Sequence, residues 1–363
     1  MPAHVQHITA YSWPEFQNLP MAQKVRCLAR EDGTPFHTLF AQQFDRANLD
    51  RLCKLATEIR TIAKSRSGML FLQSLLSHKR AMLYFTQPSS RTFLSFISAC
   101  QILGLHTGEV RDTSTSSEFK GESQEDSIRT FSSYFDLIVM RTQEKGLAEH
   151  MAWTLSNSER PVPIVNAGSG KDQHPTQALL DIYTLNRSFE RRGGLRNRAV
   201  MFVGDLARGR TVRSLSSLLL NYENIEQIFV APDGLQIGQD VIDNLAARGA
   251  RWTVSSNMRE HLPAVDAIYM TRIQDEWDSK QGESACIDTS AFKIGAEEMR
   301  LCKPDAILMH PLPRRDEIAT EVDRDPRAMY WRQMRNGMWM RAALIASTFD
   351  CATRIDEFYR ENL

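Results

Sequence analysis

Short apolar runs alternate along the chain with segments whose apolar residues recur at three- and four-residue steps. The runs are typical of buried strands, and the stepped segments are typical of helices with one apolar face. The pattern predicts strands near 81–86, 136–140, 162–165, 199–203, 227–231, 267–271 and 306–309. It predicts helices near 46–64, 90–104, 123–134, 175–186 and 337–358. Because strands and helices alternate, we predict an α/β fold built of doubly wound parallel sheets.

A break in this pattern predicts two domains. Between 188 and 198 the apolar periodicity is lost, and Gly193 and Gly194 stand among arginines that we expect to be solvated. We therefore predict one domain over 41–187 and a second over 188–336, with the C-terminal helix 337–363 packing back on the first. The sequence leaves open whether the N-terminal extension 1–40 is a docking surface or extra helix. Parallel sheets bind ligands at the carboxyl ends of their strands, so the predicted active site is a cleft between the domains.

The composition excludes several classes of function. With 363 residues, 42% of them hydrophobic, the chain can bury the cores of two domains. Lys plus Arg and Asp plus Glu both total 44, so no net positive charge favours nucleic acid or an acidic membrane. We see neither a signal peptide nor an apolar run long enough to cross a membrane. The six cysteines form no C-x-x-C pair, which argues against a structural zinc and a disulfide framework and fits a cytoplasmic setting.

The first candidate site is Ser89-Ser90-Arg91-Thr92, where a predicted strand passes into a predicted helix. The first turn of a helix offers unpaired N–H groups to an anion, and an arginine fits phosphate or carboxylate in a two-point contact. Taken alone, the stretch favours a serine helix cap followed by a solvated arginine. Further clusters downstream favour the anion site.

Two of these clusters lie in the first domain. Arg141 closes the strand near 136–140, at the edge where α/β proteins bind ligands, although a solvated strand-end arginine is equally consistent. His174 precedes Pro175, which suits the first position of a helix, and Gln177 follows one turn later on the same side. A histidine and an amide that converge on one point suit a small group with a carbonyl oxygen and an NH2. A histidine that only caps the helix is the alternative, and the spacing of Gln177 makes it the less favoured one.

The last cluster lies in the second domain. Arg210 begins a helix after the strand near 199–203, and Arg272 and Gln274 follow the strand near 267–271. Since side chains two apart in a strand share a face, Arg272 and Gln274 are expected to reach one site. Two arginines there indicate a ligand with two carboxylates. The loop after Gly204 lacks the G-x-G-x-x-G spacing, so a dinucleotide site is not predicted.

These motifs occur together in an order that resembles the aspartate/ornithine carbamoyltransferase family, specifically the catalytic chain of aspartate carbamoyltransferases. The resemblance rests on the segments 89–92, 120–122, 139–141, 174–177, 209–212, 270–274 and 310–314 and runs from about Phe40 to the C-terminal helix. Ornithine enzymes typically have H-C-L-P where this chain has His310-Pro311-Leu312-Pro313, and Ser-Met-Gly where it has Thr271-Arg272-Ile273-Gln274. The resemblance therefore implies transfer of the carbamoyl group of carbamoyl phosphate to L-aspartate, in pyrimidine biosynthesis. It implies no metal and no cofactor.

The resemblance also assigns roles to residues. It implies a carbamoyl-phosphate site made of Ser89, Ser90, Arg91, Thr92, Arg141, His174, Gln177, Leu312 and Pro313. It implies an aspartate site made of Lys120, Arg210, Arg272 and Gln274. Among these, Arg91, Thr92, Lys120 and His174 would act most directly in catalysis. Ser116 and Lys120 would come from a neighbouring subunit, so that the active unit would be a homotrimer.

Two positions depart from the family pattern. The family usually has an acid at the position of Gln87 and an arginine at that of Trp277, and these two groups help hold the closed state. Both residues are neutral here, so we expect weaker aspartate binding or altered cooperativity. A rival interpretation is a catalytically silent homologue with a structural or regulatory role, but the substrate-contacting residue types all remain. The sequence leaves open whether a regulatory chain, nucleotide effectors or a dihydroorotase partner exist.

Overall fold

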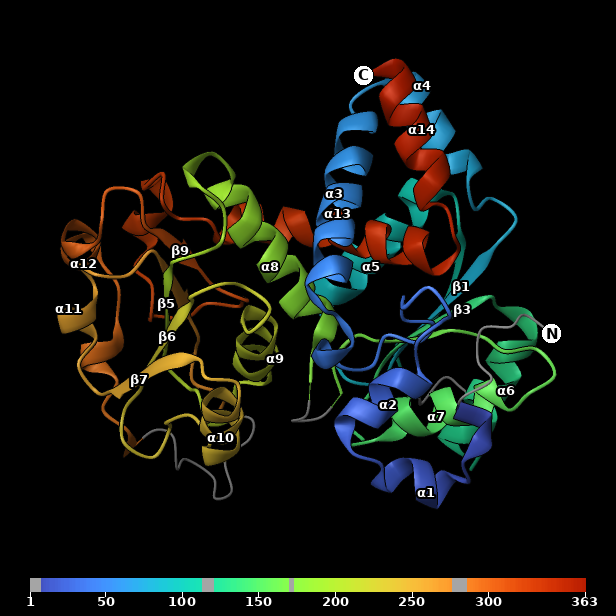
Figure 1. Ribbon diagram of the computed structural model, residues 1–363, viewed down its shortest axis with the longest axis horizontal. Helices are drawn as coiled ribbons and strands as arrows, with labels where there is room; N and C mark the ends of the chain where they lie inside the picture. The colour runs from blue at the N-terminus through green and yellow to red at the C-terminus, as the bar shows by residue number, and fades with distance from the viewer. Residues whose placement is uncertain (1–7, 113–120, 170–172, 276–285) are drawn as a thin grey trace. The chain divides into compact units, whose positions relative to one another are not determined.

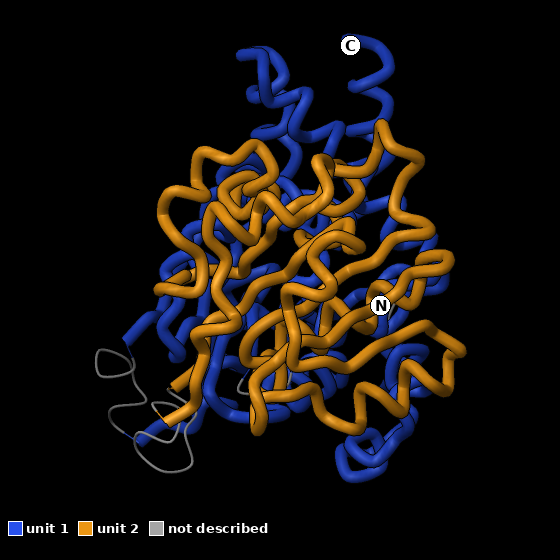
Figure 2. The backbone as a smooth tube through the Cα atoms, turned by 90° about the vertical axis from the view of Figure 1, so that its left-hand side faces the viewer, with its two compact units in different colours: residues 1–179, 337–363 blue, residues 180–336 orange. Residues whose placement is uncertain are grey.

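The computed structural model describes residues 8–112, 121–169, 173–275 and 286–363. The chain divides into two compact units, residues 1–179 with 337–363 (unit 1) and residues 180–336 (unit 2) (Figure 2). Each unit contains one sheet in which every strand pairs in parallel with its neighbours. The prediction of an α/β fold with two parallel sheets is confirmed.

The sheet of unit 1 has the strand order β2-β1-β3-β4. Its strands are β1 (Arg80–Phe85), β2 (His106–Val110), β3 (Leu137–Arg141) and β4 (Ile164–Asn166). The helices that begin in this unit are α1 (Trp13–Asn18), α2 (Met21–Cys27), α3 (Arg46–Ile62), α4 (Arg66–Ser74), α5 (Ser90–Leu103), α6 (Gln124–Tyr134), α7 (Leu147–Ser156), α8 (Pro175–Phe189) and α14 (Ala352–Asn362). Every residue of β3 is buried, as expected for a central parallel strand covered on both faces.

The sheet of unit 2 has the strand order β7-β6-β5-β8-β9. Its strands are β5 (Ala199–Val203), β6 (Glu226–Val230), β7 (Arg251–Ser255), β8 (Ala267–Met270) and β9 (Ile307–Met309). The helices that begin here are α9 (Arg210–Leu219), α10 (Gln239–Ala247), α11 (Met258–His261), α12 (Ala296–Leu301) and α13 (Tyr330–Thr348) (Figure 1). Both α8 and α13 continue across the division between the units.

The N-terminal segment packs into unit 1, where it covers α7 (Figure 1). Phe16 of α1 is fully buried, and the indole N–H of Trp153 on α7 donates to the carbonyl of Tyr11 at 2.9 Å. Lys24 of α2 forms an ion pair with Glu149 at 2.5 Å. The described part of this segment therefore contributes helices and buried side chains to the core of the unit.

All seven predicted strands lie within two residues of observed ones, but β2 and β7 were missed. Both are edge strands with exposed positions, so their sequences, HTGEV and RWTVS, lack an apolar run. The prediction of one helix over 337–358 is wrong. Helix α13 begins earlier and ends at Thr348, and α14 follows after Asp350, whose positive φ of 57° interrupts the helical backbone.

Candidate active site

In unit 1 the carboxyl ends of β1 and β3 lie side by side where the order of strands reverses. From β1 the chain passes to β2 on one side of the sheet and afterwards to β3 on the other. Open α/β sheets bind ligands outside such a switch point. Phe85 at the end of β1 pairs in register with Arg141 at the end of β3, and the N–H of Gln87 donates to the Arg141 carbonyl at 3.2 Å. The segment that leads into α5 therefore starts beside Arg141.

Arg141 and His174 meet at Gly168, in the loop that follows β4. A Cβ atom on Gly168 would stand 2.6 Å from Nη1 of Arg141 and 3.2 Å from Cδ2 of His174, and its φ is 109°. The same Nη1 donates to the carbonyl of Ala167 at 3.1 Å. Glycine adopts this left-handed backbone without strain, and because it has no Cβ atom the side chains of Arg141 and His174 can both approach the backbone of Gly168. The structure thus brings together two residues that the sequence placed in separate clusters.

Four residues of the predicted carbamoyl-phosphate site, 89–92, lie at the start of α5. Ser89 is the N-cap residue, Ser90 begins the helix, and Thr92 is buried in its first turn. Arg91 is exposed. The first turn of a helix and the positive end of its dipole are suited to binding an anion. Gln177 is buried in the first turn of α8, where its N–H donates to the His174 carbonyl at 3.0 Å, while Ser116 and Lys120 lie outside the described residues.

Unit 2 has a second switch point, between β5 and β8. From β5 the chain passes to β6 and β7 on one side, whereas β8 and β9 lie on the other. The two strand ends approach closely at Gly204, where a Cβ atom would stand 2.2 Å from the carbonyl oxygen of Thr271. The hydroxyl of Thr271 in turn donates to the Val203 carbonyl at 3.0 Å. The segments that carry Arg210 and Arg272 therefore leave the sheet from adjacent strands.

Asp205 ties these two segments together. Its carboxylate is fully buried and accepts from the N–H of Arg208 at 3.1 Å and from the N–H of Gln274 at 3.0 Å. The guanidinium of Arg208 also donates to the Gln274 carbonyl, at 3.2 Å. Burial raises the pKa of the Asp205 carboxyl, and the two backbone hydrogen bonds oppose that shift. Sequence reasoning missed Asp205; its place directly after Gly204 at a strand end was the available signal.

Arg210 and Arg272 occupy the positions that the sequence predicted. Arg210 is half-buried at the start of α9, and its N–H donates to the Arg208 carbonyl at 2.9 Å. Arg272 is also half-buried just after β8, where its Nη1 donates to the Ile273 carbonyl at 2.8 Å. Both residues thus follow strands that meet at the switch point, where cationic side chains can attract a ligand's carboxylates.

A histidine organises the loop that follows β9. His310 is fully buried, accepts from the N–H of Leu312 at 2.7 Å through Nδ1, and contacts the Glu317 carboxylate at 2.7 Å through Nε2. Because Nδ1 accepts, the proton of the neutral ring is on Nε2, which donates to Glu317. Burial lowers the pKa of His310, although Glu317 opposes the shift. The His310 N–H donates to Oε1 of Gln333 at 2.9 Å, so the loop that carries Leu312 and Pro313 is fixed from both sides.

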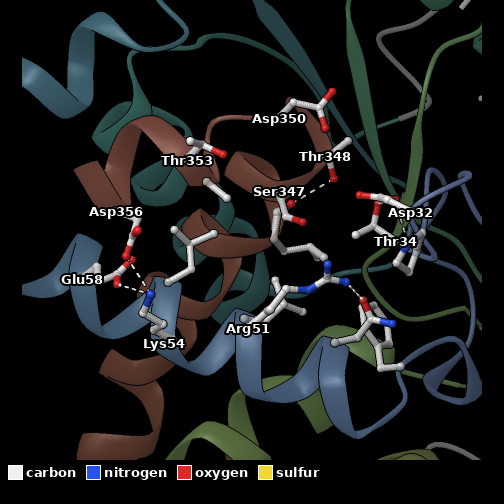
Figure 3. A pocket seen from close by; sticks show the side chains of 17 residues that line it. Asp32, Thr34, Arg51, Lys54, Glu58, Ser347, Thr348, Asp350, Thr353 and Asp356 are labelled. Atoms are coloured by element: carbon white, nitrogen blue, oxygen red, sulfur yellow. Dashed lines mark hydrogen bonds and ion pairs between the residues drawn. The ribbon is translucent and has the colours of Figure 1, made fainter. Parts of the chain in front are cut away.

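A separate pocket of about 370 Å³ lies in unit 1 between α3, α14 and the N-terminal segment (Figure 3). Lys54 points toward the carboxylates of Asp356, at 2.7 Å, and Glu58, at 3.3 Å (Figure 3). Burial raises the pKa of Glu58. The residues that line this pocket include none of the predicted substrate residues, so it is distinct from both switch points.

The described residues hold no group of three or more His, Cys, Asp or Glu side chains that could bind a metal ion. Within the same ranges, no helix has the length and apolar character needed to span a membrane.

Each unit is an α/β unit with a parallel sheet and has arginines at its switch point. This is typical of proteins that bind small anionic ligands at the carboxyl ends of strands. Comparison with known proteins identifies the family within this class. Residues 37–187 match the sequence model of the aspartate/ornithine carbamoyltransferase carbamoyl-P binding domain, and residues 196–348 match the model of the Asp/Orn binding domain. The chain belongs to the aspartate/ornithine carbamoyltransferase family.

Individual relatives agree with this family. The chain is 40% identical over 312 residues to aspartate carbamoyltransferase 1, chloroplastic, of Pisum sativum. This alignment covers 84% of this chain and 76% of the relative. It is 38% identical over 311 residues to an aspartate carbamoyltransferase catalytic subunit of Vibrio cholerae, over 85% of this chain and 95% of the relative. Among solved structures, aspartate transcarbamoylase from Trypanosoma cruzi in complex with carbamoyl phosphate and aspartate matches with a TM-score of 0.77 and 37% identity. That match covers 86% of this chain and 96% of the other.

Proposed function

We propose that this chain transfers the carbamoyl group of carbamoyl phosphate to the amino group of L-aspartate, giving N-carbamoyl-L-aspartate and phosphate. The observation that carries the proposal is the meeting of Arg141 and His174 at Gly168, on the switch point of unit 1. A buried cation beside a histidine suits a substrate that has a phosphate and a carbonyl oxygen next to each other. The relatives' shared activity supports the same reaction.

The residues of unit 1 are assigned to carbamoyl phosphate. The phosphate is held by Ser89, Ser90, Arg91, Thr92 and Arg141. As phosphate leaves, its negative charge grows, and the guanidinium groups and the N-terminus of α5 stabilise it. His174 and Thr92 donate to the carbamoyl oxygen, where charge builds in the tetrahedral intermediate. By analogy with oxyanion holes, each such donor contributes about 3–4 kcal/mol to the transition state.

The residues of unit 2 are assigned to aspartate. Arg210, Arg272 and Gln274 bind its two carboxylates, and the carbonyls of Leu312 and Pro313 together with Gln177 orient the NH2 groups. The aspartate amine attacks the carbonyl carbon, a C–N bond forms, and the C–O bond to phosphate breaks with its electron pair on phosphate. The amine gives up a proton, which the departing phosphate takes up, so that the products are N-carbamoyl-L-aspartate and phosphate. Since no side chain acts as nucleophile, positioning supplies much of the rate, and its scale is about 7–11 kcal/mol.

Purified protein tests this proposal when it is assayed with carbamoyl phosphate and either L-aspartate or L-ornithine, with the ureido product measured. Turnover with aspartate alone is expected. His174→Ala should lower kcat by about 10²–10³-fold while the protein stays folded, since one donor to the oxyanion is lost. If no ureido product forms with either amino acid, the alternative of a structural or regulatory homologue is favoured.

We further propose that the active unit is a homotrimer in which Ser116 and Lys120 act in a neighbouring subunit's site. The family resemblance supports this, and both residues lie outside the described ranges. Mixing Lys120→Ala with Arg91→Ala protein should then restore activity in hybrid trimers. No recovery after subunit exchange would contradict shared sites.

The other expectations from the sequence remain predictions. Gln87 and Trp277 are neutral, so we expect the ionic link that helps hold the closed state in the family to be missing and closure to rely on other contacts; Trp277 lies outside the described residues. Placing Glu and Arg at the two positions together should change the aspartate saturation curve, and an unchanged curve would remove this idea. A cytoplasmic location remains a prediction too, and the existence of a regulatory chain or a dihydroorotase partner remains open.

A further inference from the structure

An acidic side chain stands next to one of the proposed substrate arginines. Oδ1 of Asp275 lies 3.7 Å from Nη1 of Arg272. A carboxylate this close to a guanidinium competes with any carboxylate that the guanidinium is meant to bind. Asp275 directly follows Gln274 in the chain, so the competing charge is built into the segment that carries the aspartate site.

A second arginine neutralises this acid. Nη1 of Arg315 donates to Oδ2 of Asp275 and Nη2 donates to Oδ1, both at 2.9 Å. This is the two-point geometry that makes arginine–carboxylate pairs strong, whereas Arg272 stands farther from the same Oδ1. The acid therefore has a closer cationic partner than Arg272.

The backbone holds Arg315 in place for this contact. Its N–H donates to both carboxylate oxygens of Glu317, each at 3.1 Å. Glu317 is in turn bound by the ring of His310, which organises the loop after β9. The partner of Asp275 is thus anchored to the loop that also carries Leu312 and Pro313.

We propose that Arg315 is a positioning residue for aspartate binding: it holds the carboxylate of Asp275 and so keeps the guanidinium of Arg272 available to the substrate's carboxylate. The inference rests on the proposed function, because it requires Arg272 to bind aspartate. Arg272, Asp275 and Arg315 together carry one positive charge. Without Arg315 the net charge of the remaining two side chains is zero. Without both Arg315 and Asp275 the net charge is again one positive charge, that of Arg272.

This charge count defines the experiment. Aspartate KM is measured at saturating carbamoyl phosphate for Arg315→Gln, Asp275→Asn and the double variant. Arg315→Gln should raise aspartate KM about two- to fivefold, the range of an exposed ion pair, with kcat and the carbamoyl-phosphate KM unchanged. The effect should shrink at high salt, because both groups are partly exposed. In the double variant the aspartate KM should return to near the wild-type value, because the single positive charge is restored.

Two further variants make the outcome decisive. Arg259→Gln breaks a surface ion pair with Glu298 in the same unit and should leave the aspartate KM unchanged. Arg272→Ala tests the proposed function itself and should greatly weaken aspartate binding. If it does so while Arg315→Gln has no effect, or while the double variant stays as weak as Arg315→Gln, the positioning role is wrong and the proposed function stands. An unchanged aspartate KM in Arg272→Ala would overturn both.

Discussion

The buried carboxylate of Asp205 accepts a hydrogen bond from the backbone N–H of Gln274, 3.0 Å away, and so joins the segments that follow β5 and β8. Asp205→Asn leaves one acceptor for two N–H donors. A buried donor without a partner costs about 1–3 kcal/mol, so aspartate KM should rise about tenfold. Steady-state kinetics with both substrates check this, because the carbamoyl-phosphate KM should not change.

The matched control for this variant is Asp240→Asn. Asp240 is an exposed acid that pairs with Arg213 on the surface of the same unit. Its loss should leave the aspartate KM within twofold of the wild-type value, since such pairs contribute little. Equal effects of the two substitutions would show that Asp205 does not position the site.

Gly168→Ala should weaken carbamoyl-phosphate binding, because the added Cβ would lie 2.6 Å from the Arg141 guanidinium. A displacement of about 1 Å in a reactant's position can cost about 100-fold in rate, so kcat/KM for carbamoyl phosphate should fall at least tenfold. Gly234→Ala is the control. Gly234 also has a positive φ, of 81°, but no atom lies within 4 Å of its added Cβ, so only backbone strain is expected there. A similar loss of kcat/KM in both variants would contradict the crowding at Gly168.

His37 makes the stability of unit 1 depend on pH. Burial lowers the pKa of this histidine to about 3, while its Nδ1 accepts from the N–H of Ile164 at 3.1 Å. The unfolded chain takes up this proton near pH 6.5, so between that pH and the folded pKa the unfolded state binds more protons. The free energy of unfolding should therefore fall by about 1.4 kcal/mol per unit as the pH drops below about 6.5.

Urea denaturation between pH 7.5 and 4.5 measures this slope. His37→Gln should flatten it, whatever the absolute stability of the variant. His78→Gln, at an exposed histidine, should keep the wild-type slope. A wild-type slope in His37→Gln would mean that other groups cause the loss of stability at acid pH.

Arg30 caps the end of α13, since its guanidinium donates to the carbonyls of Ser347 and Thr348 and to the carboxylate of Asp350. Arg30→Met should lower the free energy of unfolding by about 1–3 kcal/mol, because buried carbonyls lose a charged donor. Asp350→Asn removes only an exposed charge and should cost under about 1 kcal/mol. Thermal or urea unfolding of both variants separates the cap from the ion pair, and equal losses would contradict the cap.

Apolar patterning predicted the central strands because they are buried on both faces. Residues 137–141 and 199–203, for example, are mostly apolar without interruption. The same rule failed for β2 and β7, whose edge positions leave three of their five residues exposed and none buried. The rule also failed to predict the break between α13 and α14. Asp350, which has a left-handed backbone conformation there, does not interrupt the pattern of apolar residues.

The amino-acid sequence determined which chemical groups are available and where each lies relative to its local element. Arg141 and Arg272 each follow a strand, and His174 precedes a proline that begins a helix. Hydrophobic periodicity places such residues because it is a local property of consecutive positions. Local order does not determine which strand ends become neighbours. The pairing of β1 with β3 and of β5 with β8, the contact of Arg141 with Gly168 and the bond from Asp205 to Gln274 join residues 27 to 69 positions apart. Contacts of this kind depend on the packing of whole sheets, so only the tertiary structure decided them.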